Sequence, residues 1–204
     1  MRRTGLERIS AITDGVIAIA ITLLVLNLDV PQITGADRGE ELAERLIAML
    51  PEFEIYLSSF AVIGFYWYAH HQIFKYIQGH DAALVWLNLA FLLTITLLPF
   101  LSELVGDYGD LKLPLVLYFS VMALTALIQT AIWSYASRNH LFIDSRISGK
   151  MIRHQTLKTV LPAVAFVLGI IVSYFELGLA RRAYFLVFLG PLIMSRFAPE
   201  LIEK

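Results

Sequence analysis

The sequence contains no cysteine and few charged residues, and both shortages narrow the classes of protein to which it can belong. Without cysteine the chain can form neither disulfides nor thiolate metal sites, and it cannot use a cysteine nucleophile. Charged residues make up 16% of the chain, compared with about 25% in soluble domains. The net charge of -1 offers no basic surface for nucleic acid. A glycine-rich loop that could hold a phosphate is also missing.

Apolar residues are abundant instead. They make up 58% of the chain, and the mean hydropathy is +0.69. The apolar residues fall into runs of about 17 to 25 residues, which is the length that a membrane-crossing helix needs. We therefore predict an all-α integral membrane protein in which residues 1–204 form a single transmembrane domain. The six predicted spans lie at about 9–30, 52–75, 82–105, 113–136, 156–175 and 179–197.

The distribution of positive charge predicts how these spans are oriented. Six spans place both termini on the same side of the membrane. Eleven of the sixteen Lys and Arg residues then fall on the side of the termini and five on the other side. Because segments rich in Lys and Arg stay in the cytoplasm, both termini are expected there.

Residues 39–50, between the first two spans, have the pattern of a short amphipathic helix. Leu42, Leu46, Ile47 and Leu50 fall on one helical stripe, and the charged residues fall on the other side. The segment is predicted to form a helix on the outer surface, and the alternative is a frayed turn.

Asp14 is an ionisable residue at the edge of the first span, where a charge is costly and needs a partner. Arg8 lies six residues earlier, which corresponds to about 240° around a helix, so the two side chains do not face each other. The predicted orientation brings polar residues of the second and third spans to the depth of Asp14. We predict a hydrogen-bonded layer made of Thr13, Asp14, one of His70 and His71, and Asn88. In the alternative interpretation, Asp14 complements the helix dipole and the histidines are interfacial anchors.

Several of these residues carry a resemblance to a known family. The first span contains Arg8, Ile12, Thr13 and Asp14, followed by the sequence AITLLVL at 20–26. This resembles the Arg-x-x-x-Phe-Ser-Asp motif and following run of potassium channels of the transmembrane-protein-175 type, with Ile and Thr replacing Phe and Ser. Residues 67–74 (WYAHHQIF) are similar to the family's Trp-x-x-His-His-x-x-Phe helix end, and residues 86–100 are similar to its third helix.

The resemblance implies a role for the first helix. In this family the first helix of each of four subunits lines the pore, a ring of branched aliphatic side chains forms the bottleneck, and a threonine one turn further on coordinates hydrated cations. Carried over to this chain, the constriction falls on Ile19, with Leu23 and Leu26 extending it, and ion selectivity falls on Thr22. The polar network at the cytoplasmic end is then expected to comprise Arg8, Thr13, Asp14, His70, His71 and Asn88.

The resemblance, together with the predicted spans, implies a potassium-selective leak channel with a hydrophobic constriction. It is expected to be a homotetramer surrounded by lipid in a bacterial inner membrane. We expect no enzymatic activity, cofactor, small-molecule substrate, nucleic-acid partner or metal other than the permeating potassium. The alternative is a proton-coupled secondary transporter that uses Asp14 and His70 or His71, because an Asp and His pair within a membrane is typical of a proton relay.

Overall fold

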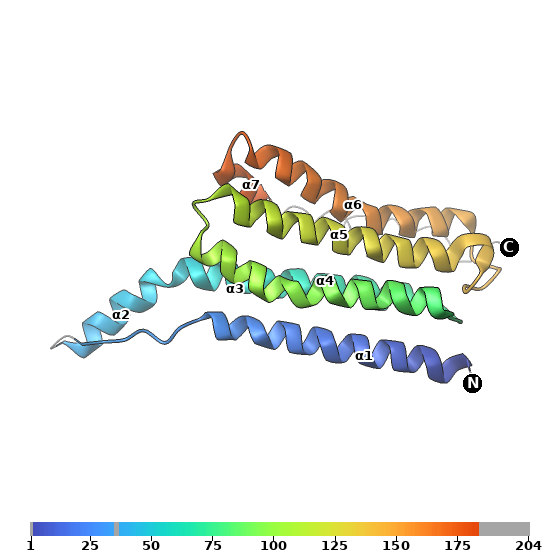
Figure 1. Cartoon of the computed structure of the whole chain (residues 1–204), viewed down its shortest axis with the longest axis horizontal. Helices are drawn as coiled ribbons and strands as arrows, with labels where there is room; N and C mark the ends of the chain where they lie inside the picture. The colour runs from blue at the N-terminus through green and yellow to red at the C-terminus, as the bar shows by residue number, and fades with distance from the viewer. Residues whose placement is uncertain (1, 35–36, 184–204) are drawn as a thin grey trace.

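The structure is a computed structural model that describes residues 2–34 and 37–183, and these residues form a bundle of long helices with one projecting arm (Figure 1). Within these ranges, strand character is limited to an isolated bridge between Ile77 and Ile143 and to a bridge residue at Ile147. The elements are α1 (Arg2–Leu23), continued by the 3-10 helix η1 (Leu24–Asn27), α2 (Arg38–Ala48), α3 (Leu50–Phe74), α4 (Ala82–Asp107), α5 (Lys112–Ser137), η2 (Arg138–His140), α6 (Gly149–Ser173) and α7 (Leu177–Ala183).

Within the described ranges, four helical segments are long and apolar enough to cross a membrane, or five if the bent pair α2 and α3 is counted as one span. The prediction of an all-helical membrane protein is therefore confirmed. The sixth predicted span, 179–197, lies mostly outside the described residues, which end at Ala183, the last residue of α7.

Two helices begin earlier than the hydropathy predicted. The first starts at Arg2 instead of near residue 9, and α6 starts at Gly149 instead of near residue 156. Ser148 caps α6, because its hydroxyl accepts a hydrogen bond from the backbone N–H of Met151 at 3.2 Å. The first two turns of α6 carry several basic and polar side chains, so a hydropathy window reads this part of the helix as a loop.

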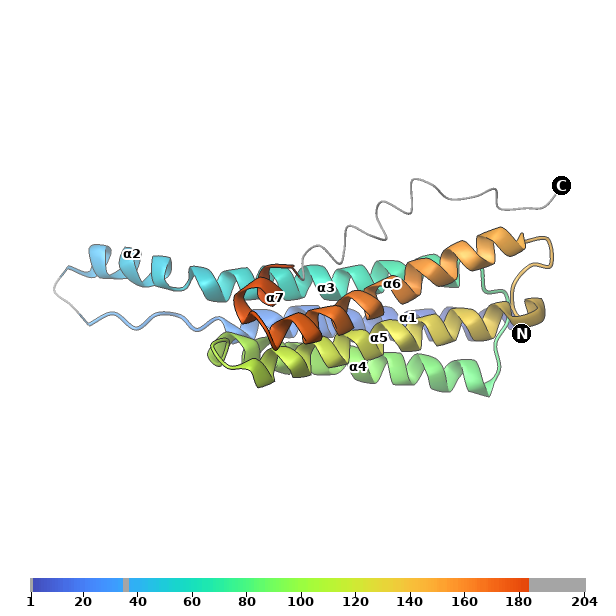
Figure 2. The same ribbon diagram turned by 90° about the horizontal axis from the view of Figure 1, so that it is seen from above.

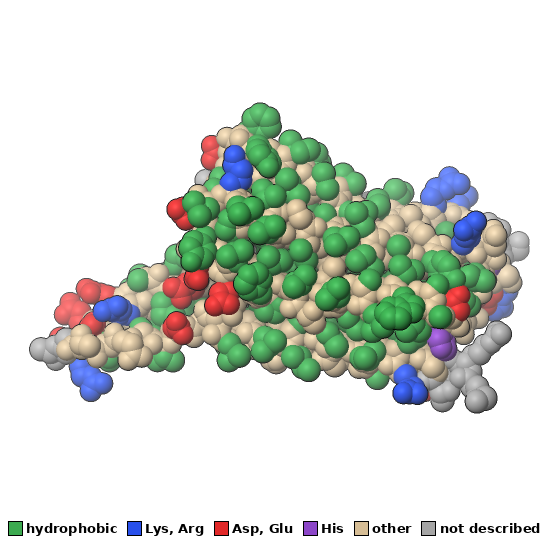
Figure 3. Space-filling view, in the orientation of Figure 1, with side chains coloured by type: hydrophobic (Ala, Val, Ile, Leu, Met, Phe, Trp, Pro, Cys, Tyr) green, Lys and Arg blue, Asp and Glu red, His purple; other side chains and the backbone are tan. Residues whose placement is uncertain are grey.

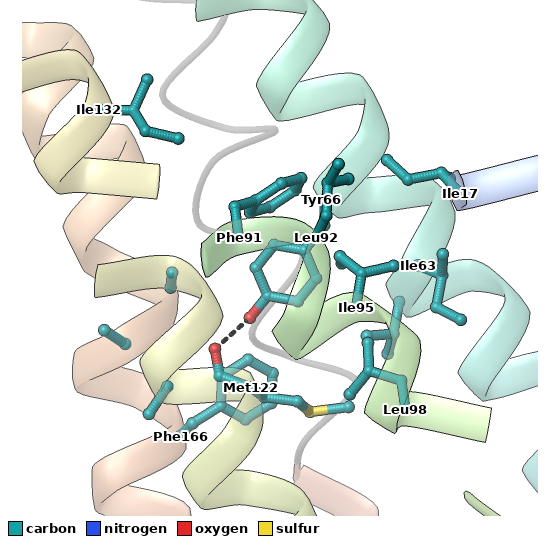
Figure 4. Close-up of a cluster of buried hydrophobic side chains, with 14 of the residues drawn as sticks. Ile17, Ile63, Tyr66, Phe91, Leu92, Ile95, Leu98, Met122, Ile132 and Phe166 are labelled. Atoms are coloured by element: carbon teal, nitrogen blue, oxygen red, sulfur yellow. Dashed lines mark hydrogen bonds between the residues drawn. The ribbon is translucent and has the colours of Figure 1, made fainter. Parts of the chain in front are cut away.

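The long helices pack in layers. The first helix lies against α3 and α4, α4 packs on α5, and α5 packs on α6 (Figures 1 and 2). The centre is apolar and includes Phe91, Ile95 and Met122, with Ile17 contributed by α1 (Figure 4). Tyr66 is fully buried there, and its hydroxyl donates to the Met122 carbonyl at 2.6 Å. The one polar group of this side chain is thus satisfied, as burial in an apolar core requires.

We call the end of the bundle at Arg2 the N-terminal end and the opposite end, from which α2 projects, the arm end. At the N-terminal end, the backbone N–H of Gln78 donates to the carbonyl of Phe142 at 2.7 Å, which joins the α3–α4 and α5–α6 loops. Asp81 caps α4 and accepts a 2.6 Å hydrogen bond from the Tyr135 hydroxyl. That hydroxyl and the helix N-terminus lower the pKa of Asp81.

The two ends differ in charge (Figure 3). Acidic side chains gather at the arm end, and most basic ones lie at the opposite end. Exposed acidic residues at the arm end include Asp29, Asp37, Glu40, Glu44, Glu52, Glu103 and Asp107.

Candidate functional site: a buried polar layer and an uncovered helix face

Three of the predicted layer residues form a buried hydrogen-bonded chain across α1, α4 and α3. The side-chain amide of Asn88 donates to Thr13 Oγ1 at 3.0 Å, and His70 Nε2 lies 2.8 Å from Asn88 Oδ1. Because the amide oxygen can only accept, Nε2 is the donor in this pair. The Thr13 hydroxyl in turn donates to the Ile9 carbonyl at 2.9 Å. The chain connects three helices without an ionised group.

The imidazole of His70 is held between two aromatic rings. Its centroid lies 4.2 Å from that of Phe74 and 5.0 Å from that of Phe91, and both pairs are stacked. Only 3% of the residue is exposed. The two rings fix the plane of the imidazole and therefore the direction of its hydrogen bond to Asn88.

Asp14 lies outside this buried chain. Its Oδ1 accepts a 2.8 Å hydrogen bond from Trp67 Nε1, and it bonds neither histidine. The indole of Trp67 stacks on His71 with a centroid separation of 5.7 Å. Asp14, Trp67 and His71 are all exposed in the single subunit. The predicted residues are thus divided between the buried chain and a second, exposed group.

Trp67 is not among the partners that the sequence predicts for Asp14, which are hydroxyl, imidazole and amide side chains. The indole N–H of Trp67 is also a hydrogen-bond donor, and it can bind a carboxylate without carrying a charge. The position of Trp67 in the sequence could have indicated its role. Trp67 precedes His71 by one helical turn and opens the segment that resembles the family motif.

Arg8 belongs to neither group. It is exposed and forms no ion pair with the described residues. Its side chain lines an open groove of about 420 Å³ between α1 and α4, together with Ile12, Val85, Asn88 and Leu89.

The residues predicted to line a pore lie on one uncovered face of α1 and η1. Ile19 is 61% exposed, Leu23 43% and Leu26 72%, and Thr22 is also exposed. The opposite face packs into the bundle through Ile17, Ala20 and Leu24, which are almost completely buried. The Thr22 hydroxyl donates to the Ile19 carbonyl at 2.8 Å, which fixes its orientation on the exposed side. The single subunit thus leaves much of this apolar face exposed.

A pocket of about 140 Å³ opens at the arm end between η1, α3 and α4. Four carboxylates line it, those of Asp29, Glu52, Glu103 and Asp107. Even so, no set of three or more His, Asp or Glu side chains in residues 2–34 and 37–183 is arranged to hold a metal ion.

Comparison with known proteins places this arrangement in a family. The model of the family described as endosomal/lysosomal potassium channel TMEM175 matches residues 8–99. A potassium channel from Streptomyces collinus is 32% identical over 181 residues, which cover 87% of this chain and 86% of that protein. A potassium channel from a Chryseobacterium species is 31% identical over 189 residues, which cover 93% of both chains.

The fold has a counterpart among solved structures. The crystal structure of a lysosomal potassium-selective channel TMEM175 homologue from Chamaesiphon minutus matches with a TM-score of 0.78 at 24% identity. The match covers 97% of this chain and 100% of the other. The bundle, and two relatives that match most of its length at more than 30% identity, show that this chain belongs to the TMEM175 family of ion channels.

Proposed function

We propose that this protein is a potassium-selective leak channel that works as a homotetramer in a bacterial inner membrane. The observation that carries the proposal is the uncovered apolar face of α1 in a chain that matches proteins named potassium channels along most of its length. An apolar face of this kind can contact lipid, but one face of one helix cannot enclose an aqueous path. Four copies of α1 around a common axis would enclose it.

In this arrangement Ile19, Leu23 and Leu26 form the constriction, and Thr22 contributes to selectivity. A narrow apolar neck excludes water when it is tight and thereby blocks ions. When it widens, a ring of Thr22 hydroxyl oxygens replaces part of the hydration shell of the potassium ion. The uncovered position of all four residues supports this assignment.

The orientation follows from charge. We infer six spans per subunit, in a single transmembrane domain, with both termini in the cytoplasm. The arm end then faces outward, and its acidic pocket raises the local concentration of cations at the mouth. The predominance of basic residues at the N-terminal end supports this orientation.

The polar layer has a structural role in this proposal. The buried chain of Thr13, Asn88 and His70 fixes the N-terminal half of α1 against α3 and α4, and the bond from Trp67 holds Asp14 beside it. His71, which stacks on Trp67, lies at the exposed border of this layer, and Arg8 lies apart from it in the groove between α1 and α4. The proton-coupled alternative is not favoured, because no hydrogen bond joins Asp14 to His70 or His71 within the described residues.

The decisive experiment measures ion flux from liposomes that contain the purified protein and no added substrate. A potassium gradient alone should drive flux, and replacement of potassium by sodium should lower it. Native mass measurement of the same preparation should give a tetramer. A strictly monomeric protein, or flux that appears only when a proton gradient is imposed, would contradict the proposal.

A further inference from the structure

The arm at the outer end of the subunit consists of residues 28–34 and 37–48, the second part being the N-cap Asp37 and α2 (Figures 1 and 2). Two hydrogen bonds organise it. Asp37 Oδ1 accepts from the backbone N–H of Glu40 at 3.2 Å, which caps α2. The backbone N–H of Thr34 donates to Glu41 Oε2 at 3.1 Å, which fastens the extended limb to the helix. The arm therefore has a defined shape although it projects beyond the bundle.

The arm, together with the first residue of α3, carries an apolar stripe that the subunit leaves partly exposed. No residue of α2 is buried. The stripe consists of Leu42, Leu46, Ile47 and Leu50, which are 38%, 44%, 66% and 61% exposed. Contiguous apolar surface on a projecting element marks a site of contact with another molecule or with a membrane.

Geometry argues against the membrane as the cover. Glu52 and Glu54 at the start of α3 are exposed carboxylates, so the hydrocarbon boundary lies no further out than Glu54. Ala48 is six residues beyond Glu54, a rise of about 9 Å if α3 follows the membrane normal. The headgroup layer is only about 5 to 8 Å thick. The bend between α2 and α3 is 46°, so α2 continues outward from that point and does not lie along the surface.

Charge argues in the same direction. Helices that lie on membranes usually carry Lys and Arg on their polar side. In contrast, α2 carries three glutamates and two arginines, and its cap is an aspartate. Arg45 is already paired with Glu41 at 3.4 Å. The polar side of the arm is thus acidic and unsuited to anionic headgroups.

We propose that the stripe packs against the arm of a second copy of this chain, so that the four arms form a collar around the outer mouth of the channel. This inference rests on the proposed tetramer. The arm continues directly from η1, whose exposed face is the proposed pore lining, so the same axis that gathers the α1 helices brings the arms together. The collar would extend the acidic entry with Asp37, Glu40 and Glu44 of each subunit.

The lack of cysteine makes the collar directly testable, since every introduced thiol is the only one in the subunit. We would place Leu46→Cys in the stripe and Leu42→Cys one turn away as a second reporter. Glu44→Cys, about 200° around the helix from position 46, is the matched control. Each variant is treated in lipid nanodiscs with a short bis-maleimide and, separately, with a bulky water-soluble maleimide. Native mass measurement reports the assembly state.

The collar predicts covalent dimers from Leu46→Cys or Leu42→Cys, and several-fold less labelling by the bulky reagent than for Glu44→Cys. Equal cross-linking at positions 44 and 46 would overturn it. Free labelling without cross-linking would overturn it too, and so would quenching of a fluorophore at position 46 by spin-labelled lipid. If the protein stays tetrameric in those cases, only the collar is contradicted and the proposed channel is not. A monomer would overturn the proposed channel as well.

Discussion

At the scale of single residues, Asn88 is the side chain on which three helices converge. It uses its amide N–H toward Thr13 of α1 and its carbonyl oxygen toward His70 of α3. Neither partner is charged, so the layer avoids the cost of burying an ion in a low-dielectric region. The amide donates through its nitrogen and accepts through its oxygen, so it can bond two different helices at once. A hydroxyl would have to donate and accept through a single oxygen.

Asn88→Ala should therefore lower the stability of the protein by about 1 to 3 kcal/mol, because two interhelical hydrogen bonds are lost and each contributes about 0.6 to 1.7 kcal/mol in a membrane protein. Thermal unfolding in detergent measures the change. Thr96→Ala on the same helix is the control, since the Thr96 hydroxyl bonds only its own helix at Leu93. Equal shifts for the two variants would show that the layer contributes nothing specific.

Trp67→Phe should lower the stability of the protein because it removes the hydrogen bond to Asp14. The substitution keeps an aromatic ring beside His71 but removes the N–H that donates to Asp14. Asp14→Ala should act on the same interaction, and Asp14→Asn should be milder because its amide oxygen still accepts. A double-mutant cycle should give a coupling free energy of about 0.5 to 1.5 kcal/mol between positions 14 and 67. If the stability losses of the two single variants simply add in the double variant, Asp14 acts only as a complement to the helix dipole.

At the scale of elements, α5 and α6 pack closely because Gly169 leaves room for an aromatic ring. A Cβ added at Gly169 would lie 2.8 Å from Cε2 of Phe119. Phe119 is almost completely buried and has Phe166 beside it, with the ring centroids 5.6 Å apart. The ring therefore has little freedom to move away.

Gly169→Ala should consequently destabilise the protein by about 1 to 3 kcal/mol through overpacking. Gly64→Ala in α3 is the control, because nothing lies within 4 Å of the Cβ position there. That control should be neutral or stabilising by up to about 1 kcal/mol, since alanine favours a helix over glycine. Chemical denaturation of both variants tests the pair. A stable Gly169→Ala protein would mean that α5 and α6 can separate at little cost.

Much of the helical order could be predicted from the sequence, because hydropathy detects long apolar segments directly. It failed where a helix is polar. The first two turns of α6 contain Lys150, Arg153 and His154, and only the cap at Ser148 indicates where the helix begins. Hydropathy also gives no information about which residue accepts a hydrogen bond from another helix. The bond from Trp67 to Asp14 depends on the rotation of α3 against α1, which only packing determines.

At the scale of the whole molecule, the chain is built to leave one helix face open. The bundle buries Ile17, Ala20 and Leu24 of the first helix and leaves Ile19 and Thr22 uncovered. In the proposed tetramer, this uncovered face would line the pore. A test of the proposed pore must therefore report on stability and on flux in the same variant.

Ile19→Ala should raise potassium flux in liposomes and lower selectivity over sodium, because a shorter side chain widens and wets the neck. Thermal stability should change little, since Ile19 is 61% exposed in the subunit. If Ile19 instead packed against a neighbouring helix, its truncation would cost about 2 to 5 kcal/mol without raising flux. That result would show that α1 does not line the pore.

Thr22→Val should leave the fold intact and reduce potassium selectivity or current. Valine has nearly the volume of threonine but lacks the hydroxyl oxygen that would replace water around the ion. The hydrogen bond lost with this hydroxyl is local to α1, from Thr22 to Ile19, so no interhelical contact is broken. Bi-ionic measurements in planar bilayers would detect the change, and unaltered selectivity would exclude Thr22 as the coordinating residue.

The winding of η1 determines how the side chains at the end of the first helix are stacked. In a 3-10 helix each residue turns by about 120° and residues three apart are eclipsed, whereas in an α-helix each turns by about 100°. Continued α-helical winding would leave Leu26 about 60° away from Leu23 around the axis. The tighter winding of Leu24–Asn27 brings the two leucines toward a single column. If this one turn relaxed to α-helical winding, Leu26 would therefore rotate out of that column without any tilt of the helix.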